Sequence, residues 1–145
     1  MAARYFALVA GLVFLIIGLA GFLPGAIQSP PEGAPELTVA SWYGYLFGLF
    51  PVNAVHNAIH LAIGIIGLAA YWQGVNWARW FGRGLAIVYA IFAVMGLIPA
   101  LSTTFGFAPL FGHDVWLHAA TAILAAYFGW FAPVDATEPA HPARA

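Results

Sequence analysis

The chain alternates four long apolar stretches with shorter polar, aromatic or proline-rich segments. The apolar stretches cover residues 5–23, about 52–72, about 84–101 and about 113–131. Each is close to the roughly 20 residues that an α-helix needs to cross about 30 Å of hydrocarbon. The pattern therefore predicts an all-α integral membrane protein, a four-helix bundle in which these four stretches are the spans.

The segments between the apolar stretches are typical of the membrane surface. Residues 24–40 contain four prolines and two glutamates, and an aromatic segment, SWYGYLFGLF, follows them. Residues 73–83 combine tryptophans with arginines, a pairing found at the lipid headgroups. We therefore expect one membrane domain over residues 1–131 and a short polar cytoplasmic tail over residues 132–145.

The arginines indicate the orientation of the chain. All four basic residues lie at one end of the predicted bundle, and the two loops at the other end have none; they are Arg4, Arg79, Arg83 and Arg144. Short loops rich in Arg and Lys remain in the cytoplasm. Both termini are therefore expected to be cytoplasmic.

The amino-acid composition limits which kinds of molecule the protein can contact or bind. Hydrophobic residues make up 63 % of the chain and charged residues 6 %, and the mean hydropathy is +0.91. Membrane lipid is thus the expected surrounding. The chain has no lysine and a net charge of −1, so it lacks the basic surface that nucleic acid requires, and we expect no nucleic-acid partner. It has no cysteine either, which excludes disulfides and thiolate metal sites.

A weak internal repeat relates the two halves of the chain. GLAGFLPG, which precedes the second span, resembles VMGLIPA, which precedes the fourth, and His60 and His118 are each followed by an apolar run that contains LAAY. The repeat predicts two helical hairpins related by a pseudo-twofold axis along the membrane normal.

Polar residues form one stripe in each of two spans. The second span opens with polar residues spaced i, i+3, i+4 and i+7, namely Asn53, His56, Asn57 and His60. The fourth opens with Asp114 and His118 at i and i+4, and Thr121 follows on the same face. At about 1.5 Å per residue, His56 and His118 lie about 6 Å from their helix starts and His60 about 12 Å. Polar groups are costly in lipid, so both stripes should face the interior at a common depth.

Three interpretations of these stripes remain open. In the first, His56, His60, Asp114 and His118 bind a transition metal, or His56, His60 or His118 binds a haem-type or chlorophyll-type pigment, with Asn53, Asn57 and Thr121 supporting them. In the second, the same side chains are a hydrogen-bonded brace in a non-catalytic accessory subunit of a larger membrane complex or in a homo-oligomer. In the third, the protein is a small transporter, although its cytoplasmic half offers no polar path.

Catalysis is not indicated. HNAIH has the histidine spacing of a zinc-protease helix, but Asn57 replaces the general-base glutamate. The serines, Ser29, Ser41 and Ser102, are not in a nucleophile-elbow sequence. The sequence therefore favours a binding, structural or transport protein over an enzyme, and it leaves open whether the protein catalyses a reaction.

Two strings resemble a known family. LFGLFPVNAVHNAIHLAIGIIGL, residues 46–68, and DVWLH, residues 114–118, resemble the signature of a bacterial family of small four-helix integral membrane proteins, domain of unknown function 4383. The resemblance covers about residues 5–131 and implies a multi-pass protein of the bacterial cytoplasmic (inner) membrane. It marks Asn53, His56, Asn57, His60, Asp114, Trp116 and His118, and it implies no reaction.

Overall fold

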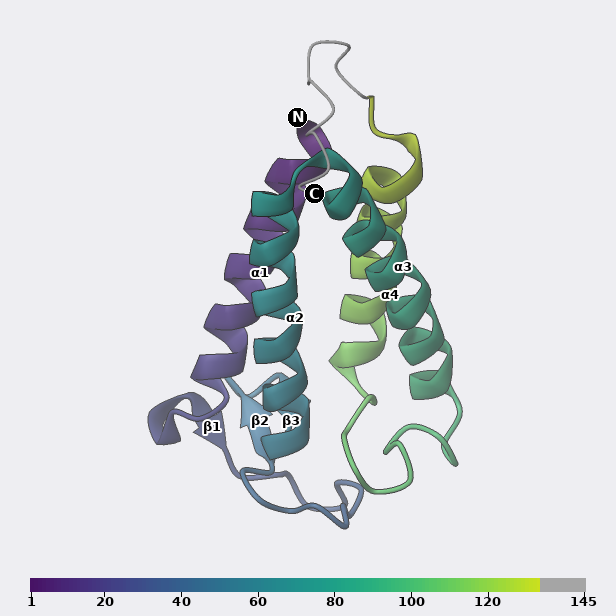
Figure 1. The fold of residues 1–145 in the computed structure, drawn as a ribbon. Coiled ribbons are helices and arrows are strands. Elements are labelled where there is room, and N and C mark those ends of the chain that lie inside the picture. Colours follow the sequence, from purple (N-terminus) through teal and green to yellow (C-terminus); the bar gives the residue numbers. More distant parts are fainter. Residues whose placement is uncertain (134–145) are drawn as a thin grey trace.

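A computed structural model describes residues 1–133 (Figure 1). Four main helices lie in this range: α1 Ala2–Ala20, α2 Ala54–Gln73, α3 Val75–Leu97 and α4 His113–Ala126. A 3-10 turn, η1 Pro24–Ala26, follows α1, and a π-helical turn, η2 Tyr127–Phe131, extends α4. Most of the predicted tail, residues 134–145 with Arg144, lies outside the described residues.

Three of the helices, α1, α2 and α3, are long and apolar enough to cross a membrane. Their outward faces carry large apolar side chains, such as Ile16, Ile65 and Leu97, which are 64, 62 and 64 % exposed. Such faces are suited to contact with lipid. The prediction of helices is confirmed, and three of the four predicted spans coincide with helices that are long and apolar enough to cross a membrane. The fourth predicted span is a shorter α-helix continued by the π turn.

The connection between the second and third spans differs from its prediction. Residues 73–83 were expected to form a polar turn, but α3 already begins at Val75, and only Gly74 separates it from α2. Gly74 has φ of 105°, a conformation that glycine adopts without steric cost. Because one glycine reverses the chain, Arg79 and Arg83 lie within α3.

A small antiparallel sheet lies at the opposite end of the molecule (Figure 1). Its strands, in the order β1-β2-β3, are β1 Ile27–Gln28, β2 Gly44–Leu46 and β3 Phe50–Val52, with Ile27 opposite Leu46 and Gly44 opposite Val52. The aromatic segment that forms β2 and part of β3 was expected only to lie at the membrane surface, and no strands were predicted for it. Leu46 of β2 and both Pro51 and Val52 of β3 are buried.

The helices pack as two pairs, α1 with α2 and α3 with α4. The pairs meet near the α2–α3 turn and diverge toward the sheet and the long loops (Figure 1). A Cβ atom added to Gly64 would lie 2.9 Å from the Gly11 carbonyl oxygen, and one added to Gly82 would lie 3.2 Å from the Gly129 Cα. The backbones of each pair are therefore in direct contact, as small residues allow in membrane proteins.

Larger side chains fill the space where the two pairs meet. One buried cluster contains Phe14, Leu85, Ala86, Tyr89, Ala122 and Ala125, and a second, nearer the turn, contains Ala3, Ala7, Ala70 and Ala78. The first cluster draws on α1, α3 and α4. Two of its members, Phe14 and Tyr89, also contact the imidazoles of His60 and His118.

The close contact between α1 and α2 predicts that a larger side chain at this point will destabilise the protein. Gly64→Ala places a methyl group against backbone atoms of α1, which cannot move aside separately, and should lower the free energy of unfolding by about 1–3 kcal/mol. Thermal unfolding in lipid nanodiscs measures the change. Gly84→Ala is the control, because a Cβ at Gly84 meets no atom within 4 Å. Equal destabilisation by both substitutions would contradict the packing argument.

Candidate functional site

The polar stripes of α2 and α4 meet in the interior and form one cluster, which we call the polar cluster: His56, His60, Asp114 and His118. The ring centroids of His56 and His60 are 4.5 Å apart, and those of His56 and His118 are 6.1 Å apart with an interplanar angle of 15°. The His56 Nδ1 and Asp114 Oδ2 atoms are 3.7 Å apart. All four side chains are buried, with exposed fractions of 3 to 7 %.

Aromatic rings from α1 and α3 surround the polar cluster. The Tyr89 ring lies 4.9 Å from the His118 ring at 68°, and the Phe14 ring lies 5.5 Å from the His60 ring. Edge-to-face and tilted contacts of this kind are favourable between rings. Every main helix thus contributes to the walls of the site. Sequence reasoning missed Phe14 and Tyr89 because they look like ordinary residues of apolar spans.

The polar cluster does not satisfy its own hydrogen-bonding groups. The Nδ1 atoms of His56, His60 and His118 and the Oδ2 atom of Asp114 are buried without a hydrogen-bond partner among the described residues. A separation of 3.7 Å between His56 and Asp114 is too long for a hydrogen bond. Each such group costs about 1–3 kcal/mol if it stays unpaired. The described side chains therefore do not form the hydrogen-bonded brace of the second interpretation.

The prediction of a transition metal or a haem-type or pigment cofactor is wrong. Within residues 1–133, no group of three or more His, Cys, Asp or Glu side chains could hold a metal ion. The imidazoles contact one another and Tyr89 through ring faces and edges. A metal site instead needs nitrogen atoms that converge on one point. The accessory-subunit alternative also finds no support in this range.

Asn53 and Asn57 have structural partners. The Asn53 Oδ1 accepts from the backbone N–H of His56 and caps α2, while its Nδ2 donates to the carbonyl oxygens of Val39 and Phe107 at 2.8 and 2.7 Å. Asn53 thereby joins the loop before α2 to the loop before α4.

The Asn57 Nδ2 donates to the carbonyl oxygen of Gly21 at 2.6 Å, just beyond the end of α1. A Cβ atom at Gly21 would overlap the Asn57 amide, so only glycine fits there.

Trp116, which the family resemblance marks, is 70 % exposed and lies outside the polar cluster.

An apolar cavity of about 440 Å³ leads to the polar cluster from the side where α1 faces α4. We call it the lateral cavity. Val9 and Val13 of α1 and Leu124 of α4 line it and are 58, 48 and 56 % exposed, so it opens toward lipid. Leu46, Phe50 and Val52 of the sheet also line it. The polar cluster and Thr121 provide the polar atoms at its inner end.

Tyr45 of β2 lies near the same end of the site. Burial of its phenol and, to a smaller degree, the nearby Asp114 carboxyl group raise the pKa of Tyr45 above its ordinary value of 10.0. The phenol therefore stays protonated across physiological pH.

The hydrogen bonds of Asn53 indicate that this side chain keeps the two loops ordered. Asn53→Asp keeps the oxygen that caps α2 but removes the N–H donors to Val39 and Phe107, and we expect it to lower the free energy of unfolding by about 1–3 kcal/mol. The rate of backbone amide hydrogen exchange should increase in the loop that contains Val39 and in the loop that contains Phe107. Asn76→Asp, the same change at an exposed position early in α3, is the control. Unchanged exchange in both loops would refute this role.

The comparisons with known proteins support a family and no activity. No curated protein and no solved structure matches the chain. One family model matches residues 4–131, a range that includes nearly all of α1, the other three main helices and the polar cluster. On this match, the chain belongs to the family described as Domain of unknown function (DUF4383).

Proposed function

We propose that this protein binds a lipid-soluble amphipathic molecule within the membrane. The apolar part of the molecule occupies the lateral cavity, and its polar head bonds to the polar cluster. One observation carries the proposal: buried polar atoms without partners lie at the inner end of an apolar cavity of about 440 Å³. That volume is within the roughly 300–1,000 Å³ of small-molecule sites.

The membrane setting determines which part of the ligand supplies affinity. An alkyl chain gains little when it leaves lipid for the valine and leucine side chains of the lateral cavity, because both surroundings are apolar. A polar head in hydrocarbon has no hydrogen-bond partner, and neither do the Nδ1 atoms of the imidazoles. Binding pairs these groups with one another. The head is therefore the source of both affinity and selectivity.

The polar cluster favours an uncharged head with a hydroxyl or carbonyl oxygen. A neutral imidazole has one donor and one acceptor nitrogen, so a hydroxyl group can bond to it in either direction. A charged head would be costly at this depth.

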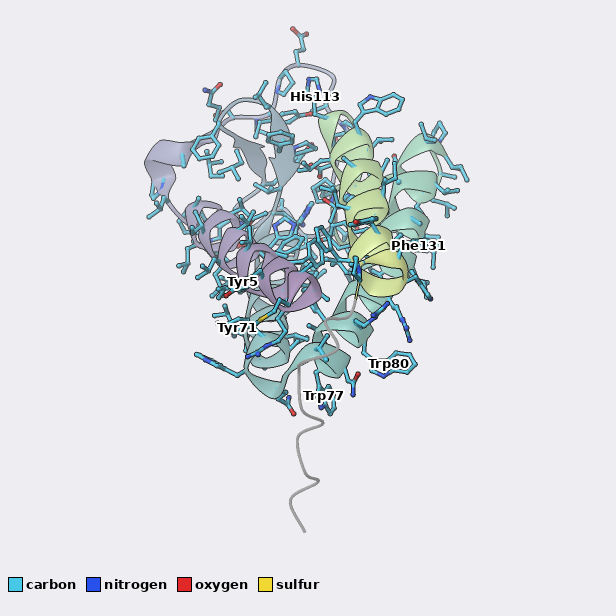
Figure 2. The ribbon with its side chains drawn as sticks, turned by 90° about the horizontal axis from the view of Figure 1, so that it is seen from above. Tyr5, Tyr71, Trp77, Trp80, His113 and Phe131 are labelled. Carbon is cyan, nitrogen blue, oxygen red and sulfur yellow. The ribbon has the colours of Figure 1, made fainter. Side chains whose placement is uncertain are left out.

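The proposal includes a topology with four spans in the bacterial cytoplasmic membrane and cytoplasmic termini. The π turn after α4 lengthens it toward the span that its sequence predicts. Arg79 and Arg83 of α3 donate to the carbonyl oxygen of Gly129, near the end of this turn. Trp77 and Trp80 lie at the same end, opposite His113 (Figure 2). The glycine contacts within each helix pair support two related hairpins.

Ligand binding is tested with 4-decylphenol in phosphatidylcholine nanodiscs that contain the protein. We expect saturable binding that decylbenzene, which lacks the hydroxyl group, does not compete. His118→Phe keeps a ring beside Tyr89 but removes the imidazole nitrogens, and should weaken binding about tenfold. Val13→Trp, which fills the lateral cavity from its lipid side, should abolish binding.

Leu12→Trp is the matched control for Val13→Trp. Leu12 and Val13 are 46 and 48 % exposed on α1, but only Val13 lines the lateral cavity. The control should therefore bind 4-decylphenol like the wild type. Competition by decylbenzene, or equal loss of binding in both tryptophan variants, would show that the phenol only partitions into the protein surface.

Topology is tested with single cysteines, since the chain has none of its own. We expect Glu32→Cys, in the loop before α2, to react with a membrane-impermeant maleimide on intact bacterial cells. Gln73→Cys, at the α2–α3 turn, should react only after permeabilisation. Both positions are exposed. The reverse pattern would invert the topology, and labelling of both from outside would exclude it.

A further inference from the structure

Two arginines of α3 bond to the end of η2 and keep most of their hydrogen-bond donors unused. The Arg83 Nε donates to the carbonyl oxygen of Gly129 at 3.0 Å, and the Arg79 Nη2 donates to that of Trp130 at 2.9 Å. Each guanidinium group has five N–H donors, and at most two of them are used in this way. The others have no acceptor within residues 1–133.

The carboxylates of the described part of the chain lie far from these arginines. Glu32 and Glu36 are in the loop between β1 and β2, and Asp114 is in the first turn of α4. Both places are at the end of the molecule opposite the α2–α3 turn and η2 (Figure 1). The other two acidic residues, Asp135 and Glu138, lie outside the described residues. No described carboxylate therefore offsets the positive charge of the two arginines.

Two tryptophan rings lie against the Arg83 guanidinium group. The Arg83 Cζ atom is 4.9 Å from the centroid of the Trp80 ring and 5.9 Å from that of the Trp130 ring. Such cation–π contacts help to hold the guanidinium group in place. Trp80 and Trp130 are 65 and 42 % exposed, and tryptophan is typical of the depth of the lipid headgroups. The unused N–H donors are therefore suited to contact with lipid phosphate groups.

An apolar groove begins beside the same tryptophan. It lies between α2 and α3, has a volume of about 470 Å³, and is called here the α2–α3 groove. Trp77 and Trp80 line it near the turn, and Val88 and Tyr89 line it deeper in the membrane part. From Trp77 to Tyr89, α3 rises about 18 Å at 1.5 Å per residue, slightly more than half of the roughly 30 Å hydrocarbon core. The groove is thus long enough for one acyl chain.

From these observations we propose that the protein binds an anionic phospholipid at this end of α3. The phosphate group bonds to the unused N–H donors of Arg79 and Arg83, and one acyl chain lies in the α2–α3 groove. Trp80 lies where the two parts of the site meet. Guanidinium groups form strong, often bidentate bonds to phosphate oxygens, and these two groups are one helical turn apart.

The charge of the site selects the class of headgroup. A zwitterionic lipid such as phosphatidylcholine also has a phosphate group, but its ammonium group would lie beside two arginines, and no described carboxylate at this end could pair with it. A headgroup with a net negative charge avoids this repulsion. Neither arginine lines the lateral cavity, so the inference goes beyond the proposed function and does not depend on it.

Phospholipid binding is measured by native mass spectrometry of the full chain in detergent micelles. The probes are phosphatidylglycerol, which carries a net negative charge, and phosphatidylcholine, both with one palmitoyl and one oleoyl chain. We expect the first phosphatidylglycerol to bind at least about tenfold more tightly than phosphatidylcholine. Arg79→Gln and Arg83→Gln should each weaken phosphatidylglycerol binding about fivefold, the scale of one arginine at a lipid surface, and should change phosphatidylcholine binding little.

Arg4→Gln is the matched control for the arginine variants. The Arg4 Nε donates to the Tyr71 carbonyl oxygen at 3.2 Å, and its Cζ atom is 5.1 Å from the centroid of the Tyr71 ring, so the substitution removes the same charge from similar surroundings. Tyr71 and Trp80 lie apart at this end of the molecule (Figure 2). The control should therefore keep the preference for phosphatidylglycerol. Equal losses in Arg4→Gln and Arg83→Gln would show attraction to net charge alone and would overturn the site.

A pair of tryptophan substitutions tests the position of the acyl chain. Val88 is 41 % exposed and lines the α2–α3 groove, whereas its neighbour Ile87 is 54 % exposed and does not. Val88→Trp fills the groove and should weaken phosphatidylglycerol binding at least about fivefold. Ile87→Trp should bind this lipid like the wild type. If both variants bind it like the wild type, the acyl chain does not occupy the groove and the inference is wrong.

Trp80→Leu covers the case in which Arg83→Gln does not fold. The substitution removes the exposed ring that contacts Arg83 and lines the groove, and it leaves the bonds from the arginines to the carbonyl oxygens in place. We expect it to weaken phosphatidylglycerol binding about threefold, the scale of one cation–π contact.

Two results with the wild type would also overturn the inference. Equal affinity for phosphatidylglycerol and phosphatidylcholine would show that the arginines do not select an anionic headgroup. Competition by inorganic phosphate at a concentration that leaves phosphatidylcholine binding unchanged would assign the arginines to a soluble anion and not to a lipid.

Discussion

The structure depends on one constraint, which is that polar side chains inside a membrane protein must be kept from lipid. Asp114 and the three histidines of the polar cluster are only 3 to 7 % exposed although they belong to otherwise apolar helices. Hydrocarbon offers no hydrogen bonds, so the rotation of α2 and α4 about their axes is restricted to orientations that turn these side chains inward. Asn53 and Asn57, on the same face of α2, find backbone partners in two loops and at the end of α1.

The close packing within each helix pair and the open space near the polar cluster belong together. Glycines let α1 contact α2, and α3 contact α4, through their backbones. Between the pairs, Phe14 and Tyr89 are too large for such contact, and the pairs diverge toward the sheet (Figure 1). The divergence leaves two cavities that the imidazoles line. A bundle with uniformly close helices would have no room for a ligand there.

Helical periodicity explains why the two polar faces meet, but it does not determine whether they can hold a metal ion. A spacing of i, i+4 places two side chains on one helix face, and two such faces from α2 and α4 meet in the structure. The direction of the ring nitrogens follows from side-chain torsions and neighbouring rings, which no spacing encodes. The imidazoles pack against each other and against Tyr89, and no metal-binding group forms among the described residues. The sequence could thus predict that the histidines of α2 and α4 lie close together, but it could not predict the direction of their ring nitrogens.

The sequence by itself determined the apolar helices and the polar faces, because both follow from the order of residues along one chain and the cost of polar groups in lipid. It missed the one-residue turn at Gly74 and the three-stranded sheet, since short segments carry little periodicity. Only the tertiary structure decided that Asn53 joins the loops at Val39 and Phe107, which are far apart in sequence. Only the tertiary structure determined that two cavities form, because the distance between the helices depends on contacts among residues from all four helices.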